Sequence, residues 1–366
     1  MRAGGVSTGG VSTGGVSTGG ASKARAGRGP GMALTVASPG QVRLEARGPV
    51  TAGAGELLVE PDLVGLCGTD LEIIAGAIDP AYVRYPVALG HEWTGIVAEG
   101  TELAGRRIVV EGFIGCGHCA QCAAGETNLC ETYDEIGFTR DGAAASQIAV
   151  PAYLAHAVAD SVQAEDAVLT EPAAVAYRAL SRAGVTPGCQ ALVIGDGTIA
   201  LLAVMLLGLW SPAEIAMLGK RGEQAGLAAA AGAGSFSVTD VPPGYDLVVE
   251  AAGAAAAVET ALAKVRRGGT VLLLGLPPHG QAVAMAADDM VNNDLTILGS
   301  FGYTSAAWRS VVGLLNSGLL RPSVLVTHCY PLAEWEQALT ALRGGSDAGA
   351  LTGTAGPRGK VLLRIG

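Results

Sequence analysis

The middle of the chain alternates short apolar runs with longer segments that have the composition of helices. The runs are almost wholly apolar, as is typical of strands buried inside a sheet. Strands and helices that alternate in this way predict a parallel, doubly wound sheet, and therefore an α/β fold of the Rossmann type. The predicted strands are residues 191–195, 214–219, 246–253 and 270–275, and the predicted helices are residues 198–210, 222–232 and 255–265.

The pattern before and after this region is different. Residues 33–155 consist of short β-rich pieces separated by glycine and proline, and they predict an antiparallel, partly barrel-like domain. After about Thr304 the regular alternation stops. Residues 305–318 are a predicted helix and residues 359–366 a predicted strand. We expect two domains.

Composition narrows the class of protein. The chain has 366 residues, of which 49% are hydrophobic, so it can fill the cores of two domains. Its richest apolar run, Ile199–Trp210, is shorter than the roughly 20 residues that cross a bilayer, so we expect no membrane span. A net charge of −10 argues against a nucleic-acid partner. Seven cysteines, an odd number, favour a reduced and cytoplasmic location.

The first 31 residues differ from the rest of the chain. They repeat GGVST three times and contain basic but no acidic side chains. Such a segment cannot build a core, so we predict that residues 1–31 are a disordered extension and that the fold starts at Met32. The alternative reading is an organelle transit peptide.

A glycine motif follows the strand at residues 191–195. The sequence VIGDGTIALL places Gly195, Gly197 and Ala200 in the pattern GxGxxA between a predicted strand and a predicted helix. The first glycine permits a tight turn, the second lets the backbone approach a pyrophosphate, and the small third residue lets helix and strand pack closely. The motif predicts a dinucleotide site.

The end of the next strand bears on which dinucleotide binds. An acidic residue there normally accepts hydrogen bonds from the adenosine ribose of NAD, but this chain has Gly219, followed by Lys220 and Arg221. A glycine leaves room for a 2′-phosphate, and two cations can pair with it. We therefore expect NADP to be favoured over NAD. The alternative is that Lys220 and Arg221 are a solvated surface pair.

Four of the seven cysteines lie within GCGHCAQCAAGETNLC, residues 115–130. The spacing C-x2-C-x2-C-x7-C is compatible with a disulfide pair, an iron–sulfur cluster or a tetrahedral zinc site. The four are Cys116, Cys119, Cys122 and Cys130.

A second set of ligand-type residues is spread along the chain. Cys67 lies in CGTDLE, His91 and Glu92 lie in GHEWTG, and Glu171 lies in LTEPAAVAYRAL. A thiolate, an imidazole and a carboxylate are the ligand types that suit zinc. Glu171 is a candidate fourth ligand, or a carboxylate that supports the ligands.

Taken in order, these motifs resemble the zinc-dependent medium-chain dehydrogenase/reductase superfamily of the alcohol dehydrogenase type. The resemblance covers residues 33–366 and rests on CGTD, GHEWTG, the four-cysteine segment, EP, VIGDGTIA, LGSFGY and GKVLLRI. It implies a GroES-like catalytic domain with a zinc lobe, made of residues 32–171 and 305–366. It also implies a Rossmann domain at residues 172–304.

The resemblance further implies two zinc ions per chain. The four clustered cysteines would hold a structural zinc, with no position left for a substrate. The local sequence agrees, because seven residues separate Cys122 from Cys130 and Glu131 follows, whereas a bacterial ferredoxin run has a gap of three and then proline. The catalytic zinc would be held by Cys67, His91 and a carboxylate from Glu92 or Glu171.

In relatives the catalytic zinc acts as a Lewis acid on the substrate alcohol, whose hydride passes to the nicotinamide. Thr69 matches the hydroxyl that begins proton release in those relatives. Glu72 stands where many alcohol dehydrogenases carry histidine, and Glu171 stands where ethanol-type enzymes carry cysteine. Both departures favour the polyol and sugar branch. Residues 135–151 are similar to aminocyclitol dehydrogenases.

We therefore predict a zinc-dependent, NADP-preferring oxidoreductase. Its predicted substrate is a secondary alcohol of a polyol, sugar or (amino)cyclitol. The alternatives are a dehydrogenase of simple alcohols or of an amino alcohol such as threonine, and an inactive zinc-binding relative. We expect a homo-oligomer, either a dimer or a tetramer.

Overall fold

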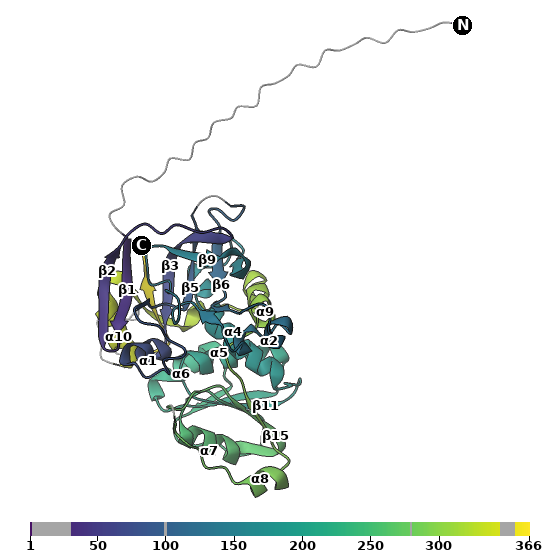
Figure 1. Cartoon of the computed structure of the whole chain (residues 1–366). Helices are drawn as coiled ribbons and strands as arrows, with labels where there is room; N and C mark the ends of the chain where they lie inside the picture. The colour runs from purple at the N-terminus through teal and green to yellow at the C-terminus, as the bar shows by residue number, and fades with distance from the viewer. Residues whose placement is uncertain (2–30, 99–100, 279, 345–355) are drawn as a thin grey trace.

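Six parallel strands form the sheet in the middle of the chain (Figure 1). The structure is a computed structural model that describes residues 1, 31–98, 101–278, 280–344 and 356–366. The strand order places β11 and β14 at the centre, so the chain winds outward from β11 in both directions and confirms the doubly wound prediction. In spatial order the strands are β13 (Ser235–Ser237), β12 (Glu214–Leu218), β11 (Gln190–Ile194), β14 (Tyr245–Glu250), β15 (Val265–Leu273) and β16 (Thr296–Gly299).

Alternate residues of the central strands enter two different cores, which explains why the runs are wholly apolar. Val193 and Val249 face the core that contains α5 (Thr198–Leu207). Leu192 and Val248 face a second core with α7 (Ala255–Lys264). The two helices therefore cover opposite faces of the sheet (Figure 1). The other helices here are α6 (Ala225–Ala231) and α8 (Ala287–Asn292).

The other domain contains a seven-stranded sheet in which every pairing is antiparallel except that of β17 with β18. This confirms the prediction of an antiparallel domain. The order is β10 (Ala155–Ala157), β6 (Arg107–Val110), β5 (Glu92–Val97), β3 (Glu56–Leu66), β18 (Lys360–Arg364) and β17 (Val326–Pro331), with β9 (Ile148–Pro151) paired to β3.

Smaller elements complete this domain. A three-stranded sheet is formed by β2 (Gln41–Arg47), β1 (Gly31–Ser38) and β4 (Val87–Ala88), and a hairpin-like pair by β7 (Phe113–Ile114) and β8 (Asp134–Glu135). The helices are α1 (Gly68–Ala75), α2 (Ala120–Ala123), α3 (Ala164–Ala167) and α10 (Trp335–Arg343). The predicted extension lies outside the described residues except for its two ends. Gly31 opens β1, one residue before the predicted start at Met32.

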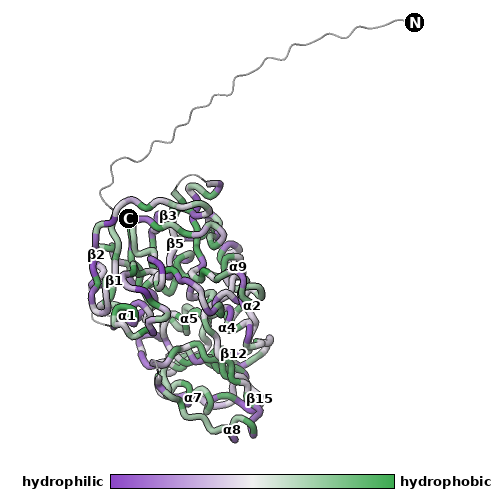
Figure 2. The backbone as a smooth tube through the Cα atoms, in the orientation of Figure 1, coloured by the Kyte–Doolittle hydropathy of each residue, from purple (hydrophilic) through white to green (hydrophobic). Residues whose placement is uncertain are grey.

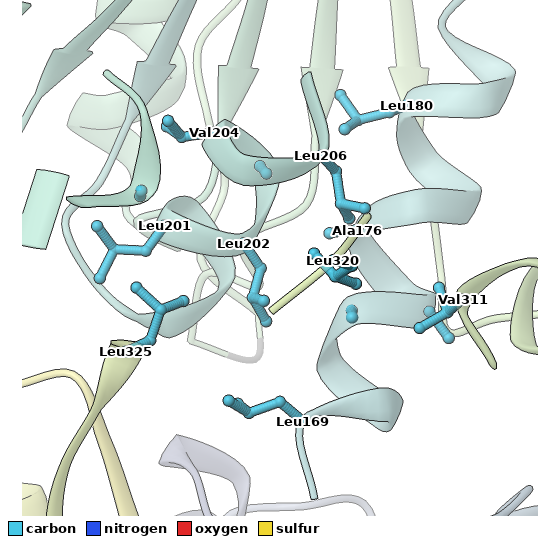
Figure 3. Close-up of a cluster of buried hydrophobic side chains, with 14 of the residues drawn as sticks. Leu169, Ala176, Leu180, Leu201, Leu202, Val204, Leu206, Val311, Leu320 and Leu325 are labelled. Atoms are coloured by element: carbon cyan, nitrogen blue, oxygen red, sulfur yellow. The ribbon is translucent and has the colours of Figure 1, made fainter. Parts of the chain in front are cut away.

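A single core joins the two domains. Helix α4 (Thr170–Arg182) packs between α5 and α9 (Ser305–Asn316), and Figure 3 shows Leu180, Leu202 and Val311 of these helices pointing into one cluster. Because α5 is covered by the sheet on one side and by α4 on another, nearly all of its residues are buried. In Figure 2 hydrophobic segments occur in both domains, and those near β12 lie beside α5. The domains thus share apolar packing.

Among the residues that the structure describes, none of the helices combines the length and the hydropathy that a membrane crossing requires.

Candidate active site and metal centres

Three predicted zinc ligands converge where β3 meets β5. Cys67 follows the last residue of β3, His91 precedes β5, and Glu92 is its first residue. The antiparallel register sets Gly65 opposite Glu92, which brings Cys67 beside His91. Cys67 Sγ lies 3.2 Å from His91 Nε2, and His91 Nε2 lies 3.8 Å from Glu92 Oε1. The three ligand atoms all lie within 4.8 Å of one another, a spacing that one metal ion can bridge.

Asp70, which sequence reasoning did not select, contacts both Cys67 and His91 on the side away from the ligand atoms. Its Oδ2 accepts a hydrogen bond of 2.8 Å from the backbone N–H of Cys67, and its Oδ1 lies 3.6 Å from His91 Nδ1. Asp70 is fully buried on α1. A carboxylate on the far ring nitrogen orients a ligating histidine so that its other nitrogen faces the metal. The sequence signal that could have identified Asp70 was an acidic residue three positions after the ligand cysteine.

The electrostatics of the group suit a divalent cation. Burial acts to lower the pKa of His91, but Cys67 and Asp70 raise that pKa well above its ordinary value. A ring that is both buried and biased toward its cationic form lies in a region of negative potential. The thiol, imidazole and carboxylate donors, together with this potential, fit zinc.

Glu171, the first acidic residue of α4, lies near enough to His91 and Glu92 for their charges to influence its pKa. Burial and the charge of Glu92 raise the pKa of its carboxyl, against the opposing effects of His91 and Lys360, to about 7. The structure therefore brings Glu171 to the site, although Glu92 is the carboxylate within 4.8 Å of Cys67 and His91.

Lys360 is a second residue that sequence reasoning missed. Its Nζ forms an ion pair with Glu92 Oε2, and only 1% of Lys360 and 2% of Glu92 is exposed. Burial acts to lower the pKa of Lys360, but Glu92 and Cys67 raise it, so the amine is charged. A Cβ at Gly65 would lie 2.6 Å from Lys360 Cε, so this glycine makes room for the pair.

Glu135, at the end of β8, is a further carboxyl group that His91 and Glu171 influence. Burial raises its pKa to about 8, while His91 lowers it and Glu171 raises it. The site thus holds more carboxyl groups than metal binding requires. Acceptors of this kind can bind substrate hydroxyl groups.

The two residues predicted for proton transfer are both on α1. Thr69 is half-buried and lies two residues after Cys67. Glu72 is exposed, and within the described parts of the chain no hydrogen bond or ion pair joins its side chain to the ligand group. The roles of Thr69 and Glu72 stay predictions.

The four clustered cysteines form a separate centre around α2. Their sulfur atoms all lie within 4.8 Å of one another, and all seven cysteines are free thiols. Backbone N–H groups of His118 and Cys119 lower the pKa of Cys116 to about 6. The pKa of Cys130 is lowered as well, whereas that of Cys122 is raised to about 12. Four convergent thiols, two of them with a lowered pKa, fit a tetrahedral zinc.

The cysteine lobe is attached to both domains. Glu126 Oε2 accepts a hydrogen bond of 2.6 Å from Arg178 Nη2 of α4. Asn128 Nδ2 donates to the carbonyl oxygen of Phe301 at 2.6 Å, in the segment that follows β16. The lobe therefore braces the connection between the domains, which gives a structural zinc a role away from the chemistry.

We expect Cys119→Ser to remove one zinc equivalent per chain and to lower the melting temperature, because three thiolates would remain without full charge compensation. Metal analysis and a thermal melt measure both effects. Cys189→Ser is the matched control, because Cys189 is a buried thiol outside the lobe, and its loss should leave the zinc content unchanged. Two zinc ions per chain in the Cys119 variant would contradict the assignment.

The glycine turn lies at the carboxyl end of β11. Gly195 has φ +124°, a conformation that favours glycine, and a Cβ there would lie 2.9 Å from the backbone of Ala251. A Cβ at Gly197 would meet nothing within 4 Å, so the turn is open on that side. Ala200 is a buried residue in the first turn of α5. The geometry fits a pyrophosphate at the start of α5.

The residues predicted to select the cofactor lie just beyond β12. Gly219 is buried, Lys220 is exposed and Arg221 is half-buried. Arg221 is not a solvated cation, because its Nη2 lies 2.7 Å from Asp196 Oδ1. The space beside Gly219 is occupied as well, since Asp196 Oδ2 would lie 2.8 Å from a Cβ there.

Comparison with known proteins adds independent findings. Residues 53–160 match the family model of the alcohol dehydrogenase GroES-like domain, and residues 164–344 match that of the glucose dehydrogenase C-terminus.

Relatives match most of the chain. D-arabinitol dehydrogenase 1 of Uromyces fabae is 29% identical, over 78% of this chain and 86% of that protein. Sorbitol dehydrogenase of Bacillus subtilis is 30% identical, over 78% of this chain and 85% of that protein. L-threonine 3-dehydrogenase of Proteus mirabilis is 29% identical, over 80% of this chain and 90% of that protein.

Solved structures agree in fold. A protein of Sinorhizobium meliloti assigned as a zinc-binding dehydrogenase and bound to NADP has a TM-score of 0.83 at 28% identity, and covers 92% of this chain and 100% of its own. The RspB alcohol dehydrogenase of Escherichia coli, complexed with NADH, has a TM-score of 0.82 at 25% identity, and covers 92% and 100%.

Proposed function

Because the chain belongs to the zinc-dependent alcohol dehydrogenase family, within the medium-chain dehydrogenase/reductase superfamily, we propose that it oxidises a secondary hydroxyl of a polyol, sugar or (amino)cyclitol. The chain is an NAD(P)-dependent dehydrogenase, and the reverse reaction reduces the corresponding ketone. The arabinitol and sorbitol dehydrogenase relatives support this substrate class.

The observation that carries the proposal is the number of carboxyl groups around His91. Glu92 affects the pKa of His91 and of Glu171, and Glu171 affects the pKa of Glu135. A metal bound by Glu171 and the ion pair of Glu92 with Lys360 leave Glu135 to accept a hydrogen bond from an additional hydroxyl group of a polyol. A simple alcohol would leave this half-buried acceptor without a substrate partner, which costs binding free energy.

Within the metal site, Cys67 and His91 are the fixed ligands and Asp70 orients His91. We assign Glu171 as the third protein ligand, because Lys360 already holds Glu92 through an ion pair. A zinc ion bound there would polarise the substrate oxygen. Thr69 then accepts the proton of the substrate hydroxyl at its Oγ1 and donates its own proton outward.

For the cofactor, we propose that NADP is favoured over NAD. Lys220 is exposed, and its side chain has no partner among the residues that the structure describes. It is therefore available to a 2′-phosphate. The NADP-bound relative supports the proposal, while the NADH-bound relative shows that the fold also accepts the other cofactor.

The same proposal includes a homo-oligomer in the cytoplasm. Strand β16 lies at an edge of the parallel sheet, where its backbone can pair with another copy. Val291 of α8, directly before it in the chain, is 80% exposed. The seven free thiols support a reducing compartment.

A substrate panel tests the function. We expect arabinitol, sorbitol and an aminocyclitol to give a kcat/KM at least about tenfold above those of ethanol and L-threonine, because only the former fill the hydroxyl subsites. Each substrate is assayed with NADP and with NAD at fixed ionic strength. A best rate with L-threonine would replace the polyol assignment by the amino-alcohol alternative, which the threonine dehydrogenase relative supports.

A further inference from the structure

Asp196 lies inside the glycine turn, but its carboxylate reaches the end of the neighbouring strand. Its Oδ2 accepts hydrogen bonds from the backbone N–H groups of Lys220 at 2.8 Å and Arg221 at 3.0 Å. β11 and β12 are adjacent and parallel, so the turns that follow them lie side by side. The acid that is missing at the end of β12 is therefore supplied by the turn after β11.

Gly219 is part of the same arrangement. A Cβ at this position would lie 2.8 Å from Asp196 Oδ2 and 2.8 Å from the ring of Phe236, closer than side-chain carbons approach other atoms. A residue larger than glycine would have to displace Asp196 or Phe236. The turn thus accommodates an acid at residue 196 and no side chain at residue 219.

Asp196 also binds the guanidinium of Arg221. Arg221 Nη2 donates to Asp196 Oδ1 at 2.7 Å and to the Asp196 carbonyl oxygen at 3.1 Å, and Nε donates to Oδ1 at 3.1 Å. Burial acts to raise the pKa of Asp196, but the hydrogen bonds from Arg221 and from the backbone of Lys220 lower it overall. The two side chains form an ion pair at neutral pH.

Two further basic residues lie near this pair. Lys220 is exposed beside it, and Arg358 is close enough for Arg221 and Asp196 to influence its pKa, which burial chiefly lowers. Gln224 links the residue Asp196 to Arg358, because its Nε2 donates to the carbonyl oxygens of Asp196 at 2.6 Å and Arg358 at 2.9 Å. Asp196 is the anion in contact with this basic cluster.

We propose that Asp196 is a specificity-determining residue that limits the preference for NADP, an inference that rests on the proposed cofactor site. Asp196 accepts hydrogen bonds from the adenosine ribose hydroxyls of NAD, in place of the acid that β12 lacks. A 2′-phosphate must instead compete with Asp196 for Arg221, and it meets the negative charge of Asp196. Without Asp196, the basic cluster would favour NADP over NAD more strongly than the intact site does.

The test is direct binding to the zinc-loaded full chain, by calorimetry, of adenosine 2′,5′-bisphosphate and of 5′-AMP. Asp196→Asn keeps an oxygen for the backbone N–H groups but removes the charge. We expect its affinity for the bisphosphate to rise about ten- to a hundredfold relative to its affinity for 5′-AMP, because Arg221 becomes free for a charge-assisted bond. NADPH and NADH binding should change in the same ratio.

Two further variants separate this role from a general effect of charge. Glu223→Gln removes a charge from an exposed acidic residue two positions after Arg221, and it should leave the ratio unchanged. Arg221→Gln should weaken bisphosphate binding about tenfold or more, and the gain from Asp196→Asn should vanish when Arg221→Gln is also present.

An unchanged ratio in Asp196→Asn, or an equal gain with Arg221→Gln present, would overturn the proposal. If Asp196→Asn does not fold, an undiminished bisphosphate affinity in Arg221→Gln overturns it as well. These nucleotide affinities do not depend on the substrate, so failure of the polyol assay would refute the proposed substrate class and leave the role of Asp196 standing.

Discussion

Replacing His91 by alanine is expected to lower kcat/KM by at least about a thousandfold while the fold is retained. A metal that loses one of its ligands can no longer hold the substrate oxygen, and the lost polarisation is worth several kcal/mol in the transition state. The cysteine lobe is attached through Glu126 and Asn128 rather than through His91, so its metal should remain. We therefore expect zinc content to fall from two to one per chain.

The measurement combines steady-state kinetics, metal analysis and circular dichroism on the same preparation. Asp70→Asn should give an intermediate loss of about 10- to 100-fold, because it leaves the imidazole in place without its orienting carboxylate. Glu72→Ala should be milder than either variant, because Glu72 is exposed. Near-normal turnover by the His91 variant would exclude the zinc mechanism altogether.

Replacing Lys360 by methionine is expected to lower the free energy of unfolding by about 3–5 kcal/mol. The substitution leaves Glu92 as a buried carboxylate, and Glu92 has only 2% of its surface exposed to water. Neutralising both Glu92 and Lys360 should restore most of the lost free energy of unfolding. We therefore expect the double variant Glu92→Gln/Lys360→Met to be more stable than Lys360→Met alone.

Urea unfolding of the zinc-loaded chain provides the midpoint and the slope for each variant. The full cycle requires the wild type, both single variants and the double variant, and it isolates the coupling between Glu92 and Lys360. Comparison of the same four proteins after removal of zinc shows whether the metal takes over as the partner of Glu92. A coupling below about 1 kcal/mol, the level of an exposed pair, would contradict the role of Lys360.

The sequence was sufficient for the parts of the fold and site that depend on local pattern. Parallel strands with two apolar faces produce wholly apolar runs, and those runs located the doubly wound sheet. The candidate cysteines of the lobe, Cys116 to Cys130, were found through their spacing alone. Cys67, His91 and Glu92 were recognised by ligand type within short motifs, and the structure brings them together.

The residues that were missed depend on which strands become neighbours. Lys360 reaches Glu92 because β18 pairs with β3, although most of the sequence separates these two strands. Its one sequence signal was a lysine at the start of the apolar run KVLLRI. Asp196 was not selected, since nothing in the motif shows that its carboxylate reaches the end of β12. Asp70 could have been found from helix capping at Cys67.

The position of β18 has a consequence for the order in which the chain can fold during synthesis. β18 lies between β3 and β17, yet it is made only after the entire parallel sheet. The parallel-sheet domain is continuous and can fold first, as domains generally do during translation. The surrounding domain must wait with one edge of β3 unpaired and Glu92 lacking its cation. A stall of the ribosome before Lys360 would therefore leave an apolar strand edge unpaired and open to aggregation.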